Sequence, residues 1–396
     1  MRILFIHNKY KLSGGEDQVL ENEKNILESN DHKVKTVFFD NTEIESISDK
    51  LKLSYQLLYN KRSEKIVREA ILEFMPDIVH IHNLFYLASP SVLYAAHESK
   101  IPVVLTLHNY RLICSGALLM RDSKPCELCV GKIFPVAGVR YGCHRGSRLQ
   151  TAQLTLAVGA HKLLNTWAGK VSRYIALTEF AKEKFIHSSL NLRPEQIVAK
   201  PNSVDDVGLS DVSEREDYFL FAGRLSHEKG IEVALKAFEN KSAKLEIMGE
   251  GPLKDVVEKA AKRNTNIKYL GYGDKSSVIA KLKKCRALIV PSVCYENLPT
   301  AVLEAFSSGT PVVISDIGNL NEIVAHEYNG IHFKTNDPAD LYEKVRVFPD
   351  KDSRYEQLCV NSRQTYLEKY TKQINYKNLI AIYESAIKQL NATKIA

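Results

Sequence analysis

The sequence predicts an α/β protein made of two doubly wound domains, each with a parallel sheet between two layers of helices. Three observations lead to this fold class. Short apolar runs rich in β-forming residues alternate with helical patterns along the whole chain, which is typical of βαβ units. A polar segment at residues 201–217 interrupts this series, which then begins again. The length of 396 residues also exceeds one ordinary core and suits two domains of about 200 residues.

The first half begins with an apolar run that is expected to be a strand, followed by a glycine loop and a helix. The helix is predicted because Val19, Leu20, Ile26 and Leu27 fall on one face at helical spacing. Four more apolar runs follow, with a longer helical region before the last of them. The strands expected in this half are 2–7, 34–39, 78–82, 103–107 and 174–177.

The second half repeats the alternation with a strand at 218–222 and a helix at 231–238. The further strands expected are 244–248, 267–270, 287–290 and 312–315. The last helix, 376–390, carries one apolar stripe, formed by Leu379, Ile380, Tyr383, Ile387 and Leu390. Doubly wound sheets bind ligands at the carboxyl ends of their strands, so polar residues that follow a strand are the site candidates.

Composition limits the class of protein. Hydrophobic residues make up 44% and charged residues 26% of the chain, a globular composition that argues against disorder. No apolar run approaches the ~20 residues of a membrane span, and the start turns polar by His7, too early for a signal peptide. The number of cysteines, seven, is odd. The protein is therefore expected to stay in the reducing cytoplasm without a disulfide framework.

The excess of positive charge, +7 in the whole chain, lies in the first half. No acidic residue occurs between Glu127 and Glu179. The cations of that stretch are Lys132, Arg140, Arg145, Arg148, Lys162, Lys170 and Arg173. Such a patch attracts phosphates, an anionic membrane face or nucleic acid. A nucleic-acid partner is not expected, because no helix-turn-helix, zinc-finger or aromatic RNA-binding motif accompanies the charge.

The strongest site signal is the segment from Tyr295 to Glu304, which reads YENLPTAVLE. Pro299 suits the first position of a helix, where its missing N–H costs no hydrogen bond. The opening amides and the dipole of that helix form an anion site. Glu296 in the loop can reach a sugar, and Glu304, inside the helix, can accept hydrogen bonds from ribose hydroxyls.

This segment resembles the Glu-x7-Glu motif of the retaining family 4 glycosyltransferases. Four more motifs fall in the family's order: residues 201–205 (PNSVD), 221–230 (FAGRLSHEKG), 248–252 (MGEGP) and 307–312 (SSGTPV). The resemblance covers nearly the whole chain, and Ser203 stands where the family usually has glycine.

The resemblance implies the GT-B architecture, in which two Rossmann-like doubly wound domains face each other and the C-terminal helix crosses back to the first domain. The expected divisions are 1–203 for an acceptor-side domain, 204–372 for a nucleotide-sugar-binding domain, and 373–396 for the helix that packs on the first domain.

The activity that the resemblance implies is retaining transfer of a hexose-type sugar from a UDP- or GDP-linked donor. The acceptor is expected to be a glycan or a lipid-linked molecule in surface polysaccharide biosynthesis. A sugar-nucleotide epimerase or a phosphorylase would share the architecture, but the combination of Arg224 and Lys229 with Glu296 and Glu304 favours the transferase.

Residue roles follow from the same resemblance. Glu296 and His108, which comes at the end of strand 103–107, are expected to be catalytic. The donor is expected to contact Gly14, Gly15, Arg224, Lys229, Asn297, Leu298 and Glu304, with the two cations neutralising the leaving diphosphate. No Asp-x-Asp stands where a metal-dependent transferase needs one, so catalysis is expected to use no metal or other cofactor. The acceptor side is expected at His82, Asn83, Asn109 and Arg145.

Four cysteines form a separate cluster with the spacing Cys-x11-Cys-x2-Cys-x13-Cys: Cys114, Cys126, Cys129 and Cys143. The central pair has the knuckle spacing of zinc sites, and four thiolates suit a structural zinc ion. A group of buried thiols is the alternative, and the sequence leaves both interpretations open.

The stretch without acidic residues also has two interpretations. Its segment 149–167 is apolar and lightly basic. Many members of the family that this chain resembles use lipid-diphosphate acceptors at the inner face of the membrane. The stretch is either a membrane patch that makes the enzyme peripheral to the inner face of the cell membrane, or a core helix flanked by solvated cations.

Overall fold

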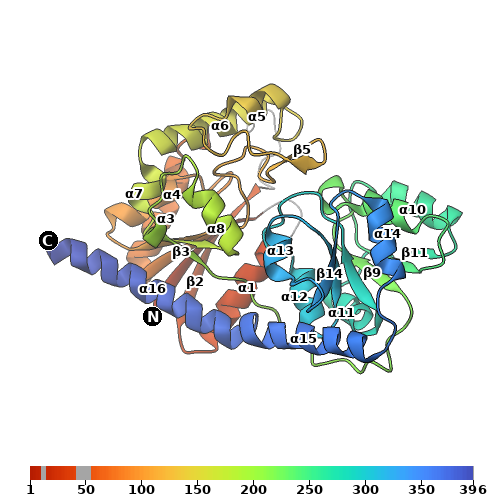
Figure 1. The fold of residues 1–396 in the computed structure, drawn as a ribbon. Coiled ribbons are helices and arrows are strands. Elements are labelled where there is room, and N and C mark those ends of the chain that lie inside the picture. Colours follow the sequence, from red (N-terminus) through yellow and green to blue (C-terminus); the bar gives the residue numbers. More distant parts are fainter. Residues whose placement is uncertain (10–14, 42–54, 396) are drawn as a thin grey trace. The chain divides into compact units, whose positions relative to one another are not determined.

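The structure is a computed structural model that describes residues 1–9, 15–41 and 55–395. The chain divides into two compact units, each with its own six-stranded sheet (Figure 1). The first unit consists of Met1–Leu119, Cys126–Pro201 and Asn375–Ala396. The second consists of Asn202–Ile374 together with the short segment Met120–Pro125.

The sheet of the first unit has the strand order β2-β1-β3-β4-β7-β8, and all of its neighbours pair in parallel. The strands are β1 (Arg2–Lys9), β2 (Lys33–Asp40), β3 (Ile78–Asn83), β4 (Val103–Thr106), β7 (Arg173–Ala176) and β8 (Ile197–Ala199). β3 and β4 are buried over their whole length, as in parallel sheets covered on both faces. The order reverses between β1 and β3, and doubly wound sheets bind ligands at the carboxyl side of such a switch point.

The helices of the first unit are α1 (Gly15–Glu28), α3 (Lys61–Phe74), α4 (Ser91–Glu98), α5 (Val136–Tyr141), α6 (Arg148–Leu163), α7 (Thr166–Lys170), α8 (Glu179–Ile186) and most of α16 (Lys372–Ile395). α16 belongs to the core of this unit, because Leu379, Ile382 and Tyr383 pack in one buried cluster with residues of β1, α1 and β3. α5 and α6 pack against each other (Figure 1).

The second unit has the strand order β11-β10-β9-β12-β13-β14, again all parallel. The strands are β9 (Phe219–Ala222), β10 (Leu245–Met248), β11 (Ile267–Tyr269), β12 (Ala287–Val290), β13 (Val312–Ser315) and β14 (Gly330–Phe333). The helices are α9 (Ile231–Phe238), α10 (Lys254–Arg263), α11 (Lys275–Lys284), α12 (Thr300–Ser307), α13 (Asn319–Ile323), α14 (Pro338–Arg346) and α15 (Ser353–Lys369). Here the switch point lies between β9 and β12.

The predicted fold class, two doubly wound α/β domains, is confirmed. Each expected strand is present within two residues of its predicted bounds, and the helix expected at 231–238 is α9. The unexpected elements include β8, β14 and the hairpin of β5 (Met120–Arg121) and β6 (Lys124–Pro125). β8 has only three residues, and β14 begins with glycine and contains His332, so neither forms an apolar run that the sequence pattern can detect.

The helix expected to start at Pro299 begins one residue later, with Pro299 immediately before Thr300. The polar segment 201–217 contains neither helix nor strand. Among the described helices, none combines the length and the apolar composition that crossing a membrane requires.

Candidate active site

Two loops meet at the switch point of the second unit. One follows β9 and runs to Gly230, and the other follows β12 and runs to Pro299. The Val293 N–H donates to the Glu228 carbonyl at 3.0 Å. A Cβ on Gly230 would lie 1.8 Å from the Pro291 carbonyl oxygen, and the φ of Gly230 is +67°. Only glycine permits this approach and this backbone conformation, so the two loops are held together at one point.

That point places Lys229 against Glu296. The Lys229 Nζ lies 2.7 and 2.9 Å from the two carboxylate oxygens of Glu296, and the Ser292 hydroxyl donates to Oε1 at 2.6 Å. Burial alone would lower the pKa of Lys229, but the neighbouring Glu296 carboxylate raises it above its usual value. The pair is therefore charged, with Glu296 8% exposed and the Lys229 side chain 31% exposed.

The other predicted donor-side residues of this unit lie in the same two loops or in α12. Arg224 is exposed in the β9 loop and forms no ion pair within the described part of the chain. Leu298 is buried, and the Asn297 carbonyl accepts a hydrogen bond from the Asn319 side-chain amide at 2.9 Å. These residues lead into α12, whose first amides have no partners inside the helix and attract anions.

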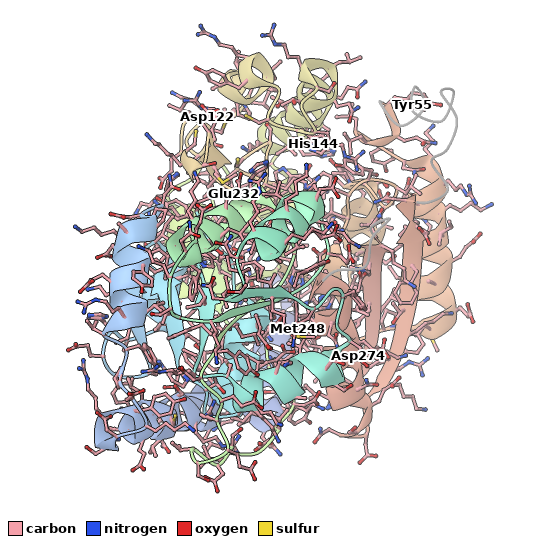
Figure 2. All side chains as sticks on the ribbon, turned by 90° about the vertical axis from the view of Figure 1, so that its right-hand side faces the viewer. Tyr55, Asp122, His144, Glu232, Met248 and Asp274 are labelled. Carbon is pink, nitrogen blue, oxygen red and sulfur yellow. The ribbon has the colours of Figure 1, made fainter. Side chains whose placement is uncertain are left out.

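Glu304 lies on α12 and is only partly exposed. Burial raises its pKa to about 7, with nearby Lys275 lowering it and Asp205 raising it. No side chain among the described residues forms a hydrogen bond with its carboxylate. Lys275 is the first residue of α11, whose N-terminus is capped by Asp274. Asp274 is labelled in Figure 2, as is Met248 at the end of β10. Glu304 is thus a partly desolvated carboxyl group to which no side chain in the described part of the protein donates a hydrogen bond.

In the first unit, only part of the predicted glycine loop can be assessed. Gly14 lies outside the described residues, whereas Gly15 is the first residue of α1. A Cβ added to Gly15 would meet nothing within 4 Å, so packing does not require this glycine. Next to it, burial raises the pKa of Glu16 to about 8, against the opposing effect of Arg111.

His108 comes two residues after the end of β4 and contacts a buried cluster. Its Nε2 lies 3.1 Å from Nδ1 of His82 on β3. His82 Nε2 in turn lies 3.6 Å from Glu23 Oε2 on α1, and Glu23 Oε1 lies 2.7 Å from the Lys200 ammonium. Burial lowers the pKa of His108 to about 3, so its ring is neutral at physiological pH.

Of the predicted acceptor-side residues, two serve the local backbone. The Asn83 side chain donates to the Asn8 carbonyl at 2.8 Å and accepts from the Phe85 N–H at 3.0 Å. The Asn109 side chain accepts from the Arg111 N–H at 3.0 Å. His82 and Asn83 are buried, whereas Arg145 is exposed.

Arg145 lies over the ring of Tyr86, 5.3 Å from its centroid, and forms part of a group that the sequence did not predict. Arg111 donates to the Tyr86 hydroxyl at 2.8 Å, and that hydroxyl lies 2.7 Å from His144 Nε2. Burial lowers the pKa of His144 to about 4, so its ring is neutral and can accept a hydrogen bond from the Tyr86 hydroxyl (His144 is labelled in Figure 2). The sequence did contain one signal for Arg111 as a site residue. Arg111 follows the end of β4, as His108 does.

The four cysteines of the cluster lie near one another in the first unit and form no disulfide. Burial raises the pKa of the Cys129 thiol to about 11, and Cys114, Cys143 and Cys126 add to this rise. Among the described residues, the group with three ligand atoms within 4.8 Å of one another is Glu23, His80 and His82, and the cysteines do not form such a group.

Comparison with known proteins agrees with this arrangement. Residues 31–207 match the model of Glycosyltransferase Family 4, and residues 210–365 match that of Glycosyl transferases group 1. An uncharacterised glycosyltransferase of Methanocaldococcus jannaschii is 27% identical over 324 residues, which is 79% of this chain and 76% of that protein. An O-antigen biosynthesis glycosyltransferase of Escherichia coli is 26% identical over 199 residues, or 50% of this chain and 56% of the relative.

Among solved structures, Anabaena HepE in complex with UDP superposes with a TM-score of 0.67 at 16% identity, covering 97% of this chain and 100% of HepE. The two family models follow one another along the chain, one on each doubly wound sheet. The chain therefore belongs to the family 4 glycosyltransferases and has their GT-B fold.

Proposed function

We propose that this enzyme transfers a hexose-type sugar, with retention, from a UDP- or GDP-linked donor to a glycan or lipid-linked acceptor in surface polysaccharide biosynthesis. The observation that carries the proposal is the Lys229–Glu296 ion pair at the switch point of the second unit. A cation that a carboxylate keeps charged and partly exposed beside the N-terminus of α12 suits a diphosphate. The UDP bound to Anabaena HepE and the name of the O-antigen relative support the same substrate classes.

The proposed chemistry assigns each donor-side group one task. Arg224, Lys229 and the α12 amides neutralise the diphosphate as its bond to the anomeric carbon breaks. The acceptor hydroxyl forms the new bond on the same face, and its proton passes to a departing phosphate oxygen. Glu296 holds Lys229 and can contact the sugar, while Glu304 accepts the ribose hydroxyls. No step requires a metal ion or another cofactor.

The acceptor side is proposed at the carboxyl edge of the sheet in the first unit. Asn109 and Arg145 follow or border this edge beside the catalytic candidate His108, with His82 and Asn83 directly behind it at the end of β3. Arg145 and Arg111 both lie over Tyr86, and two guanidinium groups on one ring suit a phosphate of a lipid-linked acceptor.

A membrane surface is proposed as a further partner of the first unit. Leu149, Leu156 and Leu163 on α6 are 70%, 59% and 62% exposed. Their seven-residue spacing puts them on one face of the helix. Three cations accompany this stripe: Arg140 is on α5, Arg148 begins α6, and Arg145 is in the loop between these two helices. An apolar stripe with basic neighbours is typical of helices that lie in the surface of an anionic bilayer, such as the inner face of the cell membrane.

One predicted member of the basic patch is unsuited to this role. The Lys162 ammonium donates to the Lys132 carbonyl at 3.1 Å and to the Ser189 hydroxyl at 2.8 Å. Burial lowers its pKa to about 8. Lys162 therefore ties α6 to the segments that contain Lys132 and Ser189, and the membrane proposal uses Arg140, Arg145 and Arg148 without it.

A structural zinc ion remains a proposal for the four cysteines. It is supported by their spacing and by their mutual proximity around Cys129. Metal analysis of the untagged protein should give close to one zinc per chain, and Cys126→Ser with Cys129→Ser should lose it and destabilise the first unit. A preparation without zinc would show that the thiols only pack.

The experiment that tests the function is a donor screen with UDP- and GDP-linked sugars, each with and without EDTA. One donor should raise the melting temperature and be consumed, EDTA should not change its rate, and proton NMR should show the donor's anomeric configuration in the product. An inverted product would contradict retention, and loss of activity in EDTA that Mg²⁺ or Mn²⁺ restores would contradict catalysis without metal.

A further inference from the structure

A line of buried polar side chains runs through the first unit from Lys200 to His108. Lys200, Glu23 and His82 are almost completely buried, and they come from the segment after β8, from α1 and from β3. His108 ends the line and is the member that is partly exposed. Burying such groups costs free energy unless they pair, so their arrangement limits where each proton can be.

The Lys200 end of the line fixes the charge of Glu23. Its ammonium lies 2.7 Å from Glu23 Oε1 and also donates to the Pro201 carbonyl at 3.4 Å. Burial alone would raise the pKa of Glu23, but Lys200 and then His80 lower it below its usual value. Glu23 is therefore a carboxylate inside the unit.

The carboxylate fixes the tautomer of His82. Glu23 Oε2 and His82 Nε2 face each other at 3.6 Å, both are buried, and neither has a hydrogen-bond partner among the described residues. A lone pair on Nε2 would be repelled by the carboxylate, whereas an N–H is attracted. The His82 proton is thus on Nε2, and Nδ1 carries the lone pair.

The same reasoning passes to His108. Its Nε2 lies 3.1 Å from His82 Nδ1, and the ring centroids lie 5.4 Å apart with an interplanar angle of 17°, which is compatible with a hydrogen bond from one ring edge to the other. Because His82 Nδ1 accepts, His108 Nε2 must donate. The lone pair that His108 retains is on Nδ1.

We infer that Lys200, Glu23 and His82 are positioning residues that hold His108 as the Nε2–H tautomer, so that its Nδ1 accepts a hydrogen bond from a hydroxyl of the donor sugar. The use of this nitrogen on a sugar rests on the proposed function, whereas the tautomer does not. A neutral acceptor nitrogen at the end of β4 distinguishes a hydroxyl group from a ring oxygen, because only the hydroxyl can donate.

A metal ion is the competing interpretation, since Glu23, His80 and His82 place three ligand atoms within 4.8 Å of one another. Two observations disfavour it. The Lys200 ammonium already forms an ion pair with the Glu23 carboxylate, and it would repel a metal cation at the same place. Both ring nitrogens of His80 are also engaged, with Tyr383 at 2.7 Å and Thr106 at 2.8 Å.

The test is a long-range ¹H–¹⁵N spectrum of the full-length protein labelled at histidine, with the His108 signals assigned through His108→Asn. Wild-type His108 should show a protonated Nε2 and an unprotonated Nδ1 from pH 6 to 8. Glu23→Gln can donate an N–H to His82 Nε2, which moves the proton of each ring to Nδ1. The matched control Glu64→Gln, which alters an ion pair with Arg68 on α3, should leave the His108 signals unchanged.

Three results would overturn the inference: a protonated Nδ1 on wild-type His108, unchanged His108 signals in Glu23→Gln, or a stoichiometric metal ion that remains bound when Cys126 and Cys129 are both replaced by Ser. If Glu23→Gln does not fold, His82→Gln gives the second test, because it keeps the Lys200–Glu23 pair and should free His108 to exchange tautomers.

Turnover separates this inference from the proposed function. Glu23→Gln should lower kcat about tenfold, roughly the loss of one hydrogen bond, with UDP or GDP affinity unchanged. A shifted tautomer with unchanged kcat would overturn the role of Nδ1 on the sugar. A correct tautomer in a protein that turns over no sugar nucleotide would contradict the proposed function and leave the positioning of His108 intact.

Discussion

The candidate sites of the two units are built in different ways. In the second unit, Lys229 and Glu296 come from two short loops at one switch point, joined by the close approach of Gly230 to Pro291. In the first unit, His108 depends on a network whose charged pair, Glu23 and Lys200, is separated by 177 positions in the sequence. The donor side is thus carried by short contiguous motifs, and the region around His108 by the topology of the sheet.

The comparison also separates two glycines that look alike in the sequence. A Cβ on Gly230 collides with the Pro291 carbonyl, at a backbone conformation that side chains rarely adopt, whereas a Cβ on Gly15 meets nothing. One glycine is required by packing, and the other is open to a role at the ligand.

The largest effect is therefore expected for Gly230→Ala. The clash and the positive φ should destabilise the second unit by roughly 2–4 kcal/mol, measured by urea unfolding. The matched variant Gly15→Ala should change stability by at most about 0.5 kcal/mol. Equal losses of stability in both variants would remove the distinction between the two loops.

Next in size is the effect of Glu296→Gln on turnover. Loss of the charge should lower kcat by about 100-fold, while UDP or GDP affinity stays within about threefold because Lys229 and Arg224 remain. Steady-state kinetics and calorimetric titration measure the two quantities. The control is Glu232→Gln, which alters a half-exposed carboxylate on α9 that contacts His227 (Figure 2). The assignment of Glu296 is wrong if both variants keep kcat within twofold of wild type.

Glu304→Gln should weaken nucleotide binding by about 10- to 150-fold, the range for a hydrogen bond to a charged group. Because burial raises the pKa of Glu304 to about 7 and the ribose needs the carboxylate, wild-type affinity should rise between pH 6 and 8. The ionisation of the nucleotide itself affects both proteins equally. Glu304→Gln should therefore lose only the part of the pH dependence that is due to Glu304. Identical pH profiles for the two proteins would place Glu304 outside the donor site.

Ionisation of Glu304, which should strengthen nucleotide binding, should lower the stability of the fold. Its raised pKa means that the folded state binds more protons than the unfolded state between about pH 4.5 and 7, so its contribution falls as pH rises through that window. Without nucleotide, Glu304→Gln should therefore melt above wild type at pH 8 and close to it at pH 4.5. Melting curves at the two pH values provide the measurement.

The smallest effect per residue is expected at the membrane surface of the first unit. Each of Arg140, Arg145 and Arg148 should contribute about 1 kcal/mol to binding anionic vesicles, and salt should weaken this binding. Replacing the three arginines by Glu should abolish co-sedimentation of the protein with vesicles at low salt. Replacing Leu149, Leu156 and Leu163 by Ser should have the same effect. The control replaces the exposed cations Lys61, Arg62 and Lys65 of α3 by Glu, and wild-type protein that ignores the vesicles would contradict the proposal.

The fold class and the donor motifs could be predicted from the amino-acid sequence alone. The period of apolar residues marks strands and helices, and Arg224 to Gly230 and Glu296 to Glu304 are continuous segments that carry their own loop and helix signals. A residue pair such as Lys229 and Glu296 could be assigned to one site because each follows a strand, and parallel strands present their carboxyl ends at one edge.

Which polar residues of the first unit act together could not be predicted in this way, because it depends on the packing of distant segments. His82 and Asn83 are neighbours at a strand end, yet one faces Glu23 and His108 and the other holds the Asn8 backbone. Nothing in the local sequence distinguishes Glu23 or Lys200 from a surface charge, because burial and pairing depend on what α1 and the segment after β8 pack against. The environment that sets the charge of Glu23 and the tautomer of His108 exists only once distant segments have folded together.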